Sequence, residues 1–147
     1  MHVFATSFLA LYLAHLLTDF VFESDRLVAG KRNSAALAYV EHGGIHLLSA
    51  ALLLGLSSPV LVGGLDFYGA IIGLTLVHLA FDWGQLSLVR LTAKAEGTLA
   101  FVAGQLVYVF PVCVAAEIVA KTPLRELMVG PSWVQSHAEQ NLLLLVV

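Results

Sequence analysis

The sequence predicts an all-α membrane protein: a polytopic bundle of about four transmembrane helices, followed by a short interfacial C-terminal helix. The 147 residues are 59% hydrophobic and only 12% charged, whereas soluble domains are about 45–50% apolar and about 25% charged. The mean hydropathy is +0.90. Four long apolar runs follow one another along the chain. A soluble domain of this length could not bury that much apolar surface, so we expect the lipid bilayer to cover it.

The apolar runs place the expected transmembrane helices at 3–22, 35–56, 66–89 and 97–120. A helix rises about 1.5 Å per residue, so about 20 residues cross roughly 30 Å of hydrocarbon. Backbone groups in lipid must bond to one another, which favours helices. Residues 1–120 therefore form one predicted transmembrane domain. The first run has no basic leading segment and continues past Asp19 to Phe22, so we expect a retained helix and not a signal peptide.

The segment 121–147 has a different character. Thr122 suits a helix N-cap and Pro123 the first helical position. The pattern predicts a short helix on the membrane surface, with Trp133 as an interfacial anchor. The apolar tail 141–147 is too short to span a bilayer, and we expect it to dock on the bundle or on a partner.

Charged residues predict the orientation of the chain. The loops after the first and third runs, on one side, contain five basic residues: Arg26, Lys31, Arg32, Arg90 and Lys94. The other side has no basic residue before Lys121 and Arg125. Basic loops remain in the cytoplasm, so we expect both termini outside. The net charge of −3 and the absence of a basic run argue against nucleic acid as a partner.

Three of the four runs carry a polar pair four residues apart: His15 and Asp19, His42 and His46, His78 and Asp82. Residues at this spacing share one face of a helix. An acid facing lipid at mid-depth costs at least about 2.5–3.5 kcal/mol, so we expect these faces to point inward. The runs alternate in direction, which places all three pairs roughly 5–20 Å from the predicted cytoplasmic surface. The six side chains are therefore expected to meet in one pocket.

The chemistry of these groups leaves three interpretations open. Neutral imidazole and carboxylate suit a divalent transition metal such as Zn, Fe or Mn, with all six residues as candidate ligands. Hydrogen bonding between helices without a metal is an equal alternative, and a proton or ion pathway is the third. Neither an H-E-x-x-H nor a G-x-S-x-G motif is present, so no catalytic residue is assigned. Glu23 and Glu41 are the nearest candidate general bases, and Gln105 lies at a similar depth.

Three segments carry a resemblance to a known family: A-H-L-L-T-D-F-V-F-E-S-D-R-L-V-A-G-K at 14–31, E-H-G-G-I-H-L-L at 41–48 and V-H-L-A-F-D-W at 77–83. In this order and spacing, the sequence over roughly residues 8–110 resembles small bacterial membrane proteins catalogued as domain of unknown function 3307. The resemblance implies a multi-helix fold in the bacterial inner membrane and no assigned activity. It carries over to His15, Asp19, Lys31, His46, His78 and Asp82, and more weakly to His42.

The sequence departs from the family pattern at three places. Glu23 stands where the family has Gln, and Gln85 where Lys is expected. The fourth run has Gly104-Gln105-Leu-Val-Tyr108 in place of Asp-Gln-x-x-His, which removes a carboxylate and an imidazole. These losses favour a non-catalytic accessory subunit of a larger membrane protein complex as the alternative to a metal-binding protein.

Overall fold

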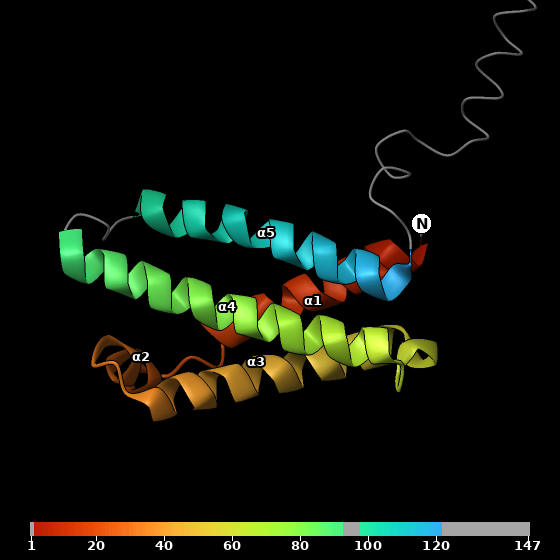
Figure 1. Ribbon diagram of the computed structural model, residues 1–147, viewed down its shortest axis with the longest axis horizontal. Helices are drawn as coiled ribbons and strands as arrows, with labels where there is room; N and C mark the ends of the chain where they lie inside the picture. The colour runs from red at the N-terminus through yellow and green to blue at the C-terminus, as the bar shows by residue number, and fades with distance from the viewer. Residues whose placement is uncertain (1, 93–97, 122–147) are drawn as a thin grey trace, which may run out of the picture.

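The computed structural model describes residues 2–92 and 98–121, and these residues are almost entirely helical, with no strand (Figure 1). The elements are α1 (His2–Phe20), α2 (Asp25–Arg32), α3 (Ala36–Ser57), the 3-10 turn η1 (Pro59–Leu61), α4 (Leu65–Thr92) and α5 (Thr98–Ala120). Within the described ranges, α1, α3, α4 and α5 are long and apolar enough to cross a membrane. The predicted all-α bundle is confirmed. The expected surface helix, Trp133 and the tail 141–147 lie outside the described residues.

The four long helices run side by side in one bundle (Figure 1). Helix α1 packs against α3 and α5, and α4 packs against the same two helices. An apolar core joins them, with Leu11, Leu54 and Val112 fully buried. Large apolar side chains such as Leu48 and Phe110 lie exposed on the outside of the bundle. In water this surface would be unfavourable, so its exposure fits a bundle surrounded by lipid.

Helix α2 lies where the sequence suggested a polar loop. Its N-cap is Ser24, whose Oγ accepts a hydrogen bond from the Leu27 backbone N–H at 3.4 Å. Asp25 lies in the first turn and Lys31 in the last, which matches the helix dipole at both ends. The sequence did not predict this helix because it contains only one buried apolar residue, Leu27. One apolar residue and one N-cap residue do not distinguish a helix of eight residues from a polar loop.

Two glycines allow the close helix contacts that shape the polar end of the bundle. A Cβ atom at Gly30 would lie 2.7 Å from Ala38 Cβ, so α2 can rest on the first turn of α3 only because this residue has no side chain. At Gly43, a Cβ atom would lie 2.8 Å from Leu79 Cδ1. The second contact brings α3 close to α4 beside their histidines.

Candidate metal centre

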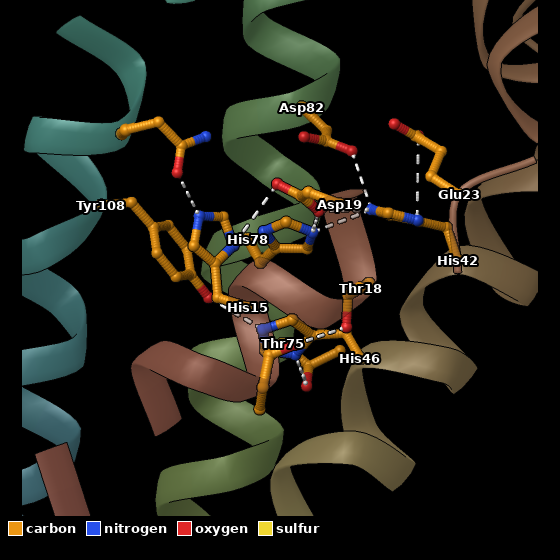
Figure 2. Close-up of polar contacts among 12 residues, drawn as sticks. His15, Thr18, Asp19, Glu23, His42, His46, Thr75, His78, Asp82 and Tyr108 are labelled. Atoms are coloured by element: carbon orange, nitrogen blue, oxygen red, sulfur yellow. Dashed lines mark hydrogen bonds and ion pairs between the residues drawn. The ribbon is translucent and has the colours of Figure 1, made fainter. Parts of the chain in front are cut away.

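The three predicted pairs converge inside the bundle (Figure 2). His15 and Asp19 come from the last turns of α1, His42 and His46 from the first half of α3, and His78 and Asp82 from α4. The four imidazole residues are at most 2% exposed. A buried His/Asp cluster is thus present, as the spacing of the pairs predicted.

The Nε2 atom of His42 has three close polar neighbours in the cluster. It lies 2.8 Å from His78 Nε2, 3.2 Å from Asp82 Oδ2 and 3.4 Å from Asp19 Oδ1. The distance between His78 Nε2 and Asp19 Oδ1 is 3.3 Å. One imidazole nitrogen carries at most one proton and cannot donate to three neighbours at once. Four atoms make these contacts, and we call them the inner group: His42 Nε2, His78 Nε2, Asp82 Oδ2 and Asp19 Oδ1. Together they carry fewer protons than hydrogen bonds at all of these contacts would require.

His46 lies beside the inner group and is held by hydrogen bonds through both ring nitrogens. Thr75 donates its hydroxyl proton to the Ile71 carbonyl at 2.8 Å, so its Oγ1 accepts from His46 Nδ1–H at 2.9 Å. The other nitrogen, His46 Nε2, then accepts from the Tyr108 hydroxyl at 3.0 Å. These contacts fix the Nδ1-protonated tautomer of His46.

Helix α5 closes the cluster on the side of His15. Gln105 Oε1 lies 3.1 Å from His15 Nε2, so the amide oxygen accepts the ring N–H. His15 Nδ1 lies 3.4 Å from Asp19 Oδ2. The Tyr108 ring stacks on the His15 ring with a centroid separation of 3.7 Å. Gln105 and Tyr108 are three residues apart on α5 and therefore reach the cluster from one helix face.

Glu23 and Lys31 form the end of the cluster where α2 lies. The Lys31 side chain is 8% exposed, and its ammonium donates to Asp82 Oδ2 at 2.6 Å and pairs with Glu23 Oε1. Burial by itself lowers the pKa of Lys31, but the Asp82 and Glu23 carboxylates outweigh it and raise the pKa above its ordinary value. Lys31 therefore acts as a fixed positive charge in the site.

Three of these residues lie outside the six that were predicted to meet in the pocket. Lys31 was counted among the basic loop residues and as a position shared with the family, Glu23 was a candidate general base, and Tyr108 was noted only as a departure from the family pattern. Tyr108 lies on the Gln105 face of α5, and Glu23 continues the series His15, Asp19 at a spacing of four. The spacing of three residues on α5 and of four residues after Asp19 could have indicated from the sequence that Tyr108 and Glu23 face the cluster. Glu41, the other candidate base, pairs instead with the exposed Arg26.

The described residues contain three overlapping sets of side chains with the composition of metal sites. In each set one ligand atom per residue lies within 4.8 Å of the others: Asp19, His42 and His78; Glu23, His42 and Asp82; His15, His46 and His78. Imidazole with carboxylate is a donor set typical of Zn²⁺, Fe²⁺ and Mn²⁺. The residues therefore fit a divalent transition metal by chemistry and by spacing.

The fold and the cluster define a class: an all-α membrane bundle with a buried His/Asp cluster. A family model described as "Protein of unknown function (DUF3307)" matches residues 7–134, and the chain belongs to this family. No curated protein and no solved structure matches the chain. Family membership confirms the resemblance found in the sequence, and it assigns no activity.

Proposed function

We propose that this protein binds one divalent transition metal ion, Zn, Fe or Mn, inside the membrane. Asp19, His42, His78 and Asp82 are the proposed inner ligands, and His15 flanks them as an auxiliary ligand through Nδ1. Both nitrogens of His46 are held by hydrogen bonds, so this residue supports the site by stacking on His78. The observation that carries the proposal is the spacing of the inner group. For an ion about 2.0–2.1 Å from four tetrahedral ligands, neighbouring ligand atoms lie about 3.3 Å apart. The distances around His42 Nε2 are 2.8 to 3.4 Å.

Charge supports the same proposal. The cluster contains the carboxylates of Asp19, Glu23 and Asp82, and one ammonium group, from Lys31. With neutral histidines, two negative charges remain uncompensated in a buried site. Unpaired buried charge is costly, especially at membrane depth. A single divalent cation offsets both charges.

A bound ion would supply Lewis acidity, which polarises a bound group and makes bound water more acidic. The chain's own residues would hold and orient that ion. Thr75 and Tyr108 fix the ring of His46, which stacks on the His78 ring, and Gln105 fixes the ring of His15. Removing residues that orient a metal site in this way typically weakens metal binding by about 10–100-fold.

The test is the metal content of the full chain, purified in mild detergent and measured by elemental analysis. We expect a stoichiometric transition metal in the native protein and its loss in Asp19→Asn. Asp66→Asn is the matched control, because Asp66 pairs with Lys121 on the surface, away from the cluster. A metal-free native protein that is folded and takes up no added zinc, iron or manganese would refute the proposal. The cluster would then be a hydrogen-bonded network between helices.

A further inference from the structure

The end of the cluster where α2 lies contains a second set of possible ligands, which shares His42 and Asp82 with the inner group and adds Glu23. Glu23, His42 and Asp82 each offer one atom within 4.8 Å of the others. His42 takes part in both sets because its two nitrogens face in different directions. Its Nε2 lies in the inner group, and its Nδ1 lies 3.9 Å from Glu23 Oε1.

His42 Nδ1 also has unused bonding capacity. The residue is 0% exposed, and this nitrogen makes no hydrogen bond within the described part of the chain. A buried polar atom without a hydrogen bond is costly unless another interaction replaces it. The direction of the nitrogen toward Glu23 indicates that a cation between the two groups would satisfy both.

A cation is already present at this position. The Lys31 ammonium contacts Glu23 Oε1 and lies 2.6 Å from Asp82 Oδ2, so it bridges the two carboxylates that a second ion would need. Lysine is a compact point charge on a flexible stem. Helix α2 holds it in place, because Gly30 packs on Ala38 and the Tyr39 hydroxyl donates to the Lys31 carbonyl at 3.4 Å.

We infer that the Lys31 ammonium fills the second cation position of the cluster and thereby limits the protein to one divalent ion. This inference rests on the proposed function. Without Lys31, a second divalent ion binds between Glu23, Asp82 and His42 Nδ1, and His42 bridges the two ions. The bridging ring releases its remaining proton on binding.

Charge balance explains why the second ion requires the loss of Lys31. Three carboxylates and one ammonium leave two negative charges, which one divalent ion offsets. Without the ammonium and the ring proton, four negative charges remain, and two divalent ions offset them. A second ion next to an intact Lys31 would leave an excess of buried positive charge, which is unfavourable.

The experiment measures zinc per chain after zinc loading and desalting of the purified full chain. We expect about one ion in the native protein and about two in Lys31→Met, which removes the charge and retains much of the side-chain volume. Arg26→Gln is the control, because this residue lies on the same helix but is 70% exposed and pairs with Glu41. It should still bind about one ion. The double variant Lys31→Met, Glu23→Gln restores the native charge balance and should return the ratio to about one.

Circular dichroism and size-exclusion profiles check that each variant is folded. If Lys31→Met does not fold, Lys31→Gln takes its place, because the amide N–H groups of Gln can still donate to the two carboxylates. The same ratio of about two zinc ions per chain is expected. A folded Lys31 variant with the native ratio overturns the inference, as does native protein that already binds two ions. Native protein that binds no zinc, iron or manganese refutes the proposed function itself, so the two failures are distinguishable.

Discussion

The Nε2 atoms of His42 and His78 lie 2.8 Å apart, although the two residues belong to different helices. Two N–H groups cannot face each other at this distance, so at most one of the two nitrogens carries a proton. The pair forms either one N–H···N hydrogen bond or two lone pairs directed at a cation. Metal binding and proton release are therefore coupled at this contact.

Zinc should stabilise the folded protein through this pair. At a free zinc concentration about 100 times the Kd, the expected gain in the free energy of unfolding is about 2.7 kcal/mol. The gain should disappear in His78→Ala, because this residue contributes one of the two facing nitrogens. Thermal unfolding followed by circular dichroism, with zinc and with a chelator, measures the difference. Equal stabilisation of both proteins would exclude His78 as a ligand.

Tyr108→Phe should weaken the cluster without unfolding the chain. The substitution removes the hydroxyl that donates to His46 Nε2 at 3.0 Å but keeps the ring that stacks on His15. We expect a loss of about 0.6–1.5 kcal/mol in the free energy of unfolding, within the range for hydrogen bonds between membrane helices.

The same variant should bind metal about 10-fold more weakly or worse, because His46 is no longer fixed beside the inner group. Competition with a chromogenic chelator measures this affinity. Tyr68→Phe is the control, because Tyr68 lies exposed on the outside of α4. Identical affinities of the two variants would remove Tyr108 from the site.

Gly30→Ala should displace α2. The new methyl group would lie 2.7 Å from Ala38 Cβ, a distance too short for two carbon atoms, so the helix must move away from α3. This movement separates Lys31 from Asp82, and hydrogen exchange in the backbone of 25–32 should accelerate. At Gly44 a Cβ atom meets nothing within 4 Å, so Gly44→Ala should leave the exchange of this helix unchanged.

The orientation of the chain in the membrane also remains a prediction. In a Cys113→Ser background, Val62→Cys should react with a membrane-impermeant maleimide in intact spheroplasts. Asn33→Cys should react only after permeabilisation, because the basic loops are expected in the cytoplasm. Both positions are exposed, so access within the protein does not limit labelling. The opposite pattern would invert the predicted topology.

Periodicity and composition were sufficient for the four long helices and for the convergence of the polar pairs. The pairs His15–Asp19 and His78–Asp82 each occupy one helix face, and a bundle in lipid offers only its interior for such groups. Alternating helix direction then places them at one depth. Helix periodicity, the inward direction of polar groups and the alternation of helix direction depend only on residues within one helix and on the order of the helices. They can therefore be read from the sequence.

The parts that could not be predicted depend on contacts between distant residues. Lys31 resembles a solvent-exposed charge until α2 is folded onto α3, and that contact depends on Gly30 meeting Ala38. The tautomer of His46 depends on Thr75 and Tyr108, from two other helices. Spacing along one helix contains no information about either relationship.

The polar cluster contains residues from α1, α3, α4 and α5, so it can be completed only after the last of these helices has been inserted into the membrane. Helices leave the translocon in order, so His15 and Asp19 are synthesised well before their partners on α4 and α5. Until then, α1 carries polar groups that lipid cannot satisfy. A nascent chain that stops after α3 would therefore be a natural substrate for membrane quality control, and only the complete set of helices removes that signal.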